Sequence, residues 1–215
     1  MSAFTDTLGA VARTVAASAD ELNRLDGQAG DGDLGVTMRT ASTIVIDLIE
    51  ELEAQSVPAA LWTCGQALAR GAPSTAGTLV ATGFLRAAKA AESSELAPSA
   101  DSLASLLEAA VEGITERGKA ARGSRTMLDA LGPAADAARA SAARGESIVD
   151  ALAQAAAAAE AGARATAGMR AVHGRAGWLA DRSTGHEDAG ARLVAIAVGA
   201  AAEAAAARRR DAPPT

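Results

Sequence analysis

The chain has 215 residues, enough for one ordinary domain with a sizeable core and no crosslinks. Its formal net charge of −6 argues against a nucleic-acid binder held by phosphate neutralisation, and its single cysteine, Cys64, excludes an internal disulfide and argues against a structural zinc site. Because only 2% of the residues are aromatic and none is tyrosine, the core must consist of aliphatic side chains and alanine, which suits closely packed helices.

The chain is predicted to be helical nearly from end to end. In the first helix one apolar stripe, with Ser18 completing its heptads, carries Phe4, Leu8, Val11, Val15, Leu22 and Leu25. This helix ends at residues 26–33, whose aspartates and glycines no helix would tolerate, and further helices are predicted at about 35–54, 57–71, 76–93, 99–118, 124–143, 146–170 and 188–209. No segment alternates apolar and polar residues long enough to predict a sheet, so we expect an all-α bundle or closed helical barrel of eight helices.

The chain is predicted to form a single domain over residues 1–215, with a loop at 92–98. Its last helix ends in Arg208, Arg209 and Arg210, which we interpret as a solvated helix end because cations suit a helix C-terminus. No basic segment followed by an apolar stretch marks a signal, and the Ala-rich stretch that begins at residue 151 is interrupted by Gln154 and Glu160. We therefore expect a soluble cytoplasmic protein with no membrane segment.

The stretch between the first two predicted helices indicates a metal site. Asp26, Asp31 and Asp33 lie within eight residues, separated by glycines and small residues. Such closely spaced carboxylates repel one another unless a cation lies between them, and ligands that are all oxygen favour magnesium or calcium. The glycines let the backbone turn so that the carboxylates converge, and the helix that follows offers unpaired N–H groups to a phosphate. The pattern predicts a site for magnesium and a nucleotide.

Three other interpretations of this loop account for its residues less well. Gly30, Gly32 and Gly35 spell the dinucleotide-binding pattern G-x-G-x-x-G, but a helix precedes them where that motif requires a strand. A calcium-binding EF-hand loop requires glutamate at its twelfth position, which is Thr37 when the count starts at Asp26. The third interpretation is an acidic surface turn that caps a helix, for which one aspartate would suffice.

The loop resembles the signature of the L subunit of dihydroxyacetone kinase and of the corresponding C-terminal domain in single-chain dihydroxyacetone kinases. That family pattern is close to D-x-x-x-x-D-G-D-x-G-x-[TN]-M, and residues 26–38 follow it from Asp26 to Met38. The resemblance implies that Asp26, Asp31 and Asp33 hold two magnesium ions that bridge the nucleotide phosphates. It also implies that the phosphates contact Thr37 and the amides of Leu34, Gly35 and Val36.

Three further segments are similar to the same family, in the same order along the chain. Residues 123–131 resemble its G-D-[KR]-T-M-x-D-A-L stretch, whose Thr-Met pair lines the adenine pocket; residues 174–179 resemble G-R-A-S-Y-L; and residues 185–191 resemble G-x-x-D-P-G-A, which closes the nucleotide site. The family loop that covers the phosphates has a divergent counterpart at 73–82. Besides residues 34–37, the resemblance assigns nucleotide contacts to Ser74, Thr75, Ala76, Gly77, Gly118, Thr126, Met127, Arg175, Asp188, Ala189 and Gly190.

The chain departs from the family pattern at four positions. Leu34 stands where the family has His or Cys, Ala76 where it has Ser, Ser124 where it has Asp, and Ala189 where it has Pro. We expect these changes to leave the metal site intact and to act on sugar specificity and nucleotide affinity. His173 and His186 are interpreted as structural or loop residues, since neither belongs to a nucleophile motif.

The resemblance covers about residues 8–205, leaves 206–215 as a tail, and implies an eight-helix antiparallel barrel with the nucleotide site at one end. It implies phosphoryl transfer from ATP, or from bound ADP that a phosphotransferase-system protein rephosphorylates, to a keto-sugar held on a separate DhaK-type subunit. Metal and phosphate positioning carry the chemistry, with no catalytic side chain, no nucleic acid and no membrane; a homodimer is left open. Two alternatives remain: a nucleotide-loaded regulatory module that acts on a partner protein or transcription factor, and the nucleotide domain of a fatty-acid kinase.

Overall fold

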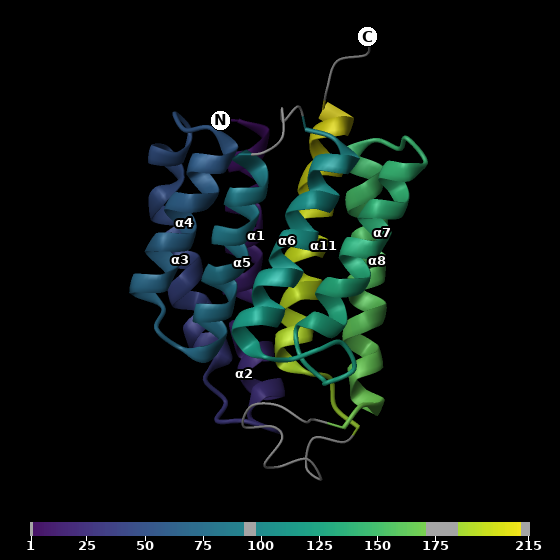
Figure 1. Ribbon diagram of the computed structural model, residues 1–215. Coiled ribbons are helices and arrows are strands. Elements are labelled where there is room, and N and C mark those ends of the chain that lie inside the picture. The colour runs from purple at the N-terminus through teal and green to yellow at the C-terminus, as the bar shows by residue number, and fades with distance from the viewer. Residues whose placement is uncertain (1, 93–97, 171–184, 212–215) are drawn as a thin grey trace.

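The computed structural model describes residues 2–92, 98–170 and 185–211, and in this part of the chain every regular element is a helix (Figure 1). The α-helices are α1 (Ala3–Ala17), α2 (Ala19–Asp26), α3 (Leu34–Leu52), α4 (Val57–Gly71), α5 (Thr75–Glu92), α6 (Ala100–Gly118), α7 (Leu128–Ala143), α8 (Ile148–Ala165) and α11 (Ala189–Asp211), and a short 3₁₀ helix, η1 (Thr166–Gly168), follows α8. The all-α prediction is confirmed.

Eight of these helices form a closed antiparallel ring. From α3 to α8 each helix packs against the next in the chain, α11 packs against α8 and α1, and α1 packs against α3. The short helix α2 lies at one end of the ring, while α1 begins and α11 ends at the other (Figure 1). In consequence α3, α5, α7 and α11 all begin at the end that α2 occupies, and α4, α6 and α8 finish there.

The first predicted helix is interrupted at Ser18, so the described residues contain nine α-helices where eight were expected. The Ser18 hydroxyl donates to the Thr14 carbonyl at 2.9 Å, and the backbone at Ser18 leaves helical geometry with φ −88° and ψ 5°. A serine that bonds to the preceding turn competes with the helix ladder. The apolar stripe continues across the break, which is why its spacing alone did not reveal it.

The two halves of the ring have different cores. On the N-terminal side the buried cluster mixes leucine, valine and alanine with Cys64, and burial raises the pKa of the Cys64 thiol to about 11. Between α6, α7, α8 and α11 the buried cluster consists of alanines alone: Ala104, Ala130, Ala134, Ala138, Ala155, Ala159, Ala163, Ala191 and Ala195. Such small side chains let the helix backbones approach closely: a Cβ added to Gly162 would lie 2.2 Å from the carbonyl oxygen of Asp129.

The C-terminal helix α11 is the one described helix that is long and apolar enough to cross a membrane by length and composition. It takes part in the closed ring, packed against α1 on one side and α8 on the other, and this position accounts for its alanine-rich sequence. Its last turn is exposed, as predicted, where Arg208 pairs with Asp6 and Arg209 with Asp150.

Candidate functional site

The acidic loop between α2 and α3 brings its three carboxylates together. One carboxylate oxygen from each of Asp26, Asp31 and Asp33 lies within 4.8 Å of the other two. Asp26 is partly buried, whereas Asp31 and Asp33 are exposed. Three oxygen ligands that converge on the protein surface, with room for water or phosphate to complete the shell, match what magnesium selects. The donor set therefore fits the ion that the sequence predicts.

Asp26 organises this loop from the end of α2. Its Oδ2 accepts hydrogen bonds from the backbone amides of Asp33 at 3.0 Å and Leu34 at 3.2 Å. Its other oxygen, Oδ1, leaves no space for a side chain at Gly30, where an added Cβ would lie 2.5 Å away. Gly32 turns the chain in the left-handed region, with φ 76°. Two of the loop glycines are thus required by geometry.

Asn23, which the sequence interpretation did not single out, caps the start of α3. Its Oδ1 accepts from the amides of Gly35 at 2.7 Å and Val36 at 3.2 Å. With Asp26 it therefore takes up the amides of residues 33–36, including those predicted to contact phosphate. A phosphate could bind these amides only by displacing the side chains of Asp26 and Asn23 from them. A phosphate bound through a metal ion on the aspartates would not have to displace them.

The predicted nucleotide residues of α3 differ in exposure. Leu34 and Gly35 are buried, Thr37 is partly buried, and the Val36 side chain is 61% exposed. Gly35 packs directly on α2, since an added Cβ would lie 1.8 Å from the carbonyl oxygen of Ala19. Leu34, at the position where the family has His or Cys, lies in a core cluster with Leu25. Its side chain therefore supports the loop from beneath.

The loop before α5 lies beside the acidic loop. Ala76 packs against the cluster that contains Leu34 and Ala189. The Ser74 hydroxyl accepts from the amide of Gly77 at 3.0 Å, which caps the first turn of α5, and an added Cβ at Gly77 would lie 2.0 Å from the carbonyl oxygen of Ala72. Thr75 is exposed. The divergent phosphate-loop segment thus reaches the same end of the ring.

On the other side of this end, Asp129 organises the connection between α6 and α7. Its buried carboxylate accepts from the amides of Gly123 and Thr126, the latter at 2.7 Å. The Thr126 hydroxyl accepts from the amide of Leu128 at 3.2 Å. Because these bonds hold residues 123–127 as a turn, α7 begins at Leu128, and the prediction of a helix from residue 124 was wrong at this boundary.

Asp188 begins α11 in the same way. Its Oδ1 accepts from the amide of Ala191 at 2.8 Å, and its own amide donates to the Thr166 hydroxyl at 2.8 Å. Burial raises the pKa of the Asp188 carboxyl to about 6, although the Ala191 hydrogen bond and the charge of Arg125 act in the opposite direction. The carboxyl is held by backbone donors in a largely dry setting.

The connection between α6 and α7 contacts the first turn of α11. An added Cβ at Gly190 would lie 3.5 Å from both the backbone nitrogen and the Cβ of Met127. Ala189 in turn belongs to the cluster with Leu34, which joins this region to the acidic loop. Gly118 ends α6 at the same end, with Leu79 beside it. Arg175, His173 and the segment 174–179 lie outside the described residues.

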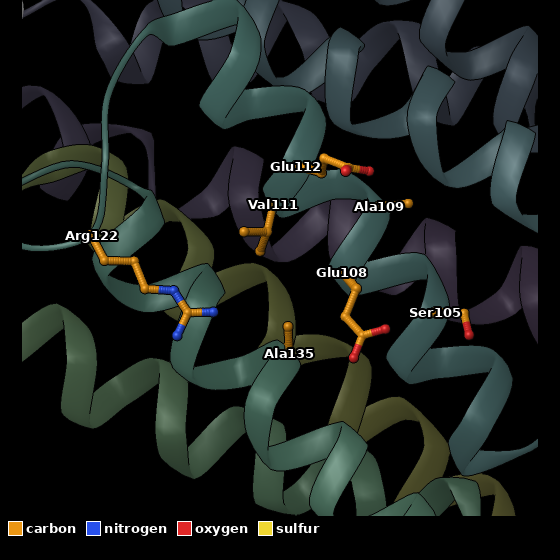
Figure 2. A pocket seen from close by; sticks show the side chains of 7 residues that line it. All are labelled: Ser105, Glu108, Ala109, Val111, Glu112, Arg122 and Ala135. Atoms are coloured by element: carbon orange, nitrogen blue, oxygen red, sulfur yellow. The ribbon is translucent and has the colours of Figure 1, made fainter.

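A groove also lies on the side of the ring, away from these residues. It measures about 410 Å³ and lies between α6 and α7, where Arg122 faces the carboxylate of Glu108 (Figure 2). Its lining consists of Ser105, Glu108, Ala109, Val111, Glu112, Arg122 and Ala135. No predicted site residue is among them, and Arg122 and Glu108 already form ion pairs with Asp136 and Arg139. We therefore assign the site to the end of the ring.

Comparison with known proteins gives one consistent result. Residues 28–203 match the DAK2 domain family. The chain is 32% identical over 175 residues to the ADP-binding subunit DhaL of PEP-dependent dihydroxyacetone kinase 1 from Listeria innocua, covering 81% of this chain and 82% of that subunit. The corresponding subunit from Escherichia coli is 30% identical, over 80% of this chain and 82% of that one.

Longer relatives match over part of their length. The D-erythrulose kinase of Mycolicibacterium smegmatis is 34% identical over 87% of this chain, which spans 32% of that enzyme. Among solved structures, the dihydroxyacetone kinase of C. freundii superposes with a TM-score of 0.76 and 25% identity over 94% of this chain and 34% of that one. The same enzyme in complex with AMP-PNP and Mg2+ gives the same values.

Proposed function

The chain belongs to the DAK2 domain family, and from this premise we propose that it is the magnesium- and nucleotide-binding subunit of a keto-sugar kinase. Two of its relatives are named as ADP-binding subunits of PEP-dependent dihydroxyacetone kinases. The observation that carries the proposal on this chain is the convergence of three carboxylates within 4.8 Å at the end of the ring where all the predicted nucleotide residues of the described segments gather.

Asp26, Asp31 and Asp33 would hold the metal. When bound, magnesium neutralises negative charge on the phosphates and orients the group to be transferred. The residues around it have separate tasks: Asp26 keeps Oδ2 on the amides of Asp33 and Leu34, and Asn23 holds the next two amides. The Asn23 amide oxygen and Oδ2 of Asp26 therefore hold the backbone of the loop, while Asp31 and Asp33 remain exposed.

The nucleoside part of the nucleotide would lie against the connection between α6 and α7 and the connection before α11. Thr126 and Met127 come from one connection; Asp188, Ala189 and Gly190 come from the other, where Gly190 packs on Met127. The phosphates would extend along the first turns of α3 and α5, which carry Thr37 and the residues Ser74, Thr75, Ala76 and Gly77. Arg175 is proposed to add a nucleotide contact.

This chain supplies no general base in the proposal. We propose that a DhaK-type subunit binds the keto-sugar and presents its hydroxyl, and that this chain presents the phosphoryl group. The phosphoryl source is either exchanging ATP or bound ADP rephosphorylated by a phosphotransferase-system protein. The similarity to subunits named as parts of PEP-dependent kinases supports the second form.

The proposal is tested on the purified full chain. Native mass spectrometry should find ADP bound in magnesium buffer and lost after chelator treatment, and titration calorimetry should then restore binding of ADP when magnesium is returned. Addition of a DhaK-type partner, a keto-sugar and either ATP or the phosphotransferase components separates the two phosphoryl sources. Failure to bind ADP at any magnesium concentration would contradict the assignment.

A further inference from the structure

Arg125 is a buried arginine that the proposed function does not use. It lies in the connection between α6 and α7, and it is 3% exposed. Its φ of 60° falls in the left-handed region, which residues other than glycine, asparagine and aspartate rarely adopt. A conformation of this kind persists only where the surrounding structure holds it, and such positions cluster at functional sites.

The Arg125 side chain reaches across to the connection before α11. Its Nη2 donates to the carbonyl oxygen of His186 at 2.8 Å. Its positive charge also favours the ionised form of Asp188, which burial disfavours, while the nearby Asp129 acts in the opposite direction on the pKa of Asp188. The guanidinium is thus bound to a carbonyl of the connection before α11 and lies near enough to Asp188 for the two opposite charges to attract.

This bond lies close to the place where the two connections meet. Thr126 and Met127 directly follow Arg125 in the chain, and Gly190 packs on Met127. A second tie holds the same segment, because the Asp188 amide donates to the Thr166 hydroxyl at 2.8 Å. By contrast, the hydrogen bonds that Asp26 and Asn23 accept from the amides of residues 33–36 lie within α2, the acidic loop and α3. The bonds from Arg125 and Thr166 therefore hold the side of the site formed by residues 123–127 and 186–190.

We propose that Arg125 is a positioning residue that sets the spacing between residues 126–127 and 188–190, and so controls affinity for the nucleoside part of the nucleotide without touching it. The absence of direct contact follows from its burial, since a side chain 3% exposed offers almost no surface to a ligand. The inference rests on the proposed function, because it presumes that a nucleotide spans both sides of the end of the ring.

The test compares two ligands that share the metal and the phosphates. Arg125→Met is expected to weaken binding of Mg-ADP by about tenfold or more, since a charge-assisted hydrogen bond is lost, and to leave binding of magnesium pyrophosphate within about twofold of the wild type. Arg125→Lys, which keeps the charge and one donor, is expected to recover part of the ADP affinity. The matched control is Arg139→Met, which removes the ion pairs of Arg139 with Asp101 and Glu108 on the outer face of α6 and α7.

A second variant protects the test against misfolding. Thr166→Val keeps the side-chain volume but removes the acceptor of the Asp188 amide, so the same selective loss of ADP affinity is expected, to a smaller extent. Equal loss of both ligands in a folded Arg125→Met protein, or unchanged ADP binding in it, would overturn the inference; if Arg125→Met does not fold, the same outcomes in Thr166→Val decide. Should the wild-type chain itself bind no Mg-ADP, the proposed function fails instead.

Discussion

Two groups of aspartates lie at the same end of the ring and are built in opposite ways. In the acidic loop, Asp26, Asp31 and Asp33 stand within eight residues of one another, and two of the three are exposed. Asp129, at the start of α7, and Asp188, just before α11, accept hydrogen bonds from backbone amides, and the positive charge of Arg125 favours the ionised form of Asp188. The first group brings three carboxylates within 4.8 Å of one another at the surface, which suits a cation, whereas the second binds backbone amides of the protein.

The acidic-loop aspartates are therefore placed to bind a cation, whereas Asp129 and Asp188 hold the local backbone. Carboxylates gathered at a surface retain lone pairs for a metal, while a buried carboxylate satisfied by amides contributes shape and holds a helix start. Substitution of an acidic-loop aspartate should therefore act mainly on ligand binding, and substitution of Asp188 should act on stability. Each is a way to test whether that division holds.

The largest effect is expected at the metal ligands. Asp31→Ala or Asp33→Ala should weaken Mg-ADP binding by more than about 100-fold, because loss of a direct ligand exceeds the loss usual for an outer-shell partner. Circular dichroism should show unchanged helicity, since both side chains are exposed. Titration calorimetry provides the measurement. Asp20→Ala is the matched control, an exposed carboxylate on α2 that pairs with Arg39.

The next effect concerns pH and the buried group. The pKa of Asp188 is raised from 3.8 to about 6 in the folded chain. Between these two pH values the folded state therefore keeps a proton on Asp188 that the unfolded state has released. The contribution of Asp188 to the free energy of unfolding therefore falls as pH rises from about 4 to about 6 and is constant above that range.

Asp188→Asn retains an acceptor for the Ala191 amide and removes this titration. The difference in unfolding free energy between Asp188→Asn and the wild type should shift in favour of the variant by up to about 3 kcal/mol across that range. Urea unfolding at a series of pH values measures it, with Asp20→Asn as control. Parallel pH profiles for the wild type and the variant would show that Asp188 does not titrate in this way.

A third effect compares close backbone approaches on the two sides. Gly35→Ala brings a Cβ to 1.8 Å from the Ala19 carbonyl oxygen, and Gly162→Ala brings one to 2.2 Å from that of Asp129. Each should lower the free energy of unfolding by about 2 kcal/mol or more, because backbone must move. Gly199→Ala in α11, with nothing within 4 Å of the added Cβ, should instead raise it by about 0.5 kcal/mol. Thermal unfolding distinguishes the three variants.

The smallest effect is expected at Asn23. Asn23→Ala removes the acceptor of the Gly35 and Val36 amides and should lower the free energy of unfolding by about 1 kcal/mol, as for other capping residues. If phosphate binds these amides directly, the variant should also bind Mg-ADP at least as tightly as the wild type. Gln66→Ala, at an exposed position on α4, is the control. A variant as stable as the wild type would show that Asn23 is not a cap.

Much of the fold could be predicted from sequence because helix signals are local. The helix predicted at 57–71 has the observed bounds of α4, and the helix predicted at 99–118 matches α6 within one residue. The predictions were wrong where a polar side chain competes with the helix ladder: at Ser18, which divides the first helix, and at residues 124–127, which Asp129 holds as a turn. Those side chains act through specific hydrogen bonds that spacing does not register.

The candidate metal centre could also be predicted from the sequence, because its three aspartates lie within eight residues and the glycines between them permit the tight turn that brings them together. Asn23 and Arg125 were not singled out, since each acts on a partner in another segment: Asn23 on the amides of α3, and Arg125 on the carbonyl of His186. An asparagine in a helix or an arginine in a loop carries no local signal for such a bond. Only the folded chain shows them.

By itself, the sequence determined that this chain is helical, that its core is built from alanine and aliphatic residues, and that an acidic glycine loop lies between helices. These properties depend on residues near one another in the chain, and the intrinsic preferences of those residues decide them. Tertiary structure alone decided which helix ends meet: closure of the ring through α11 and α1 brings Met127 to Gly190 and Leu34 to the cluster with Ala189. Packing between distant segments is a property of shape and small-residue contact, which no short stretch of sequence contains.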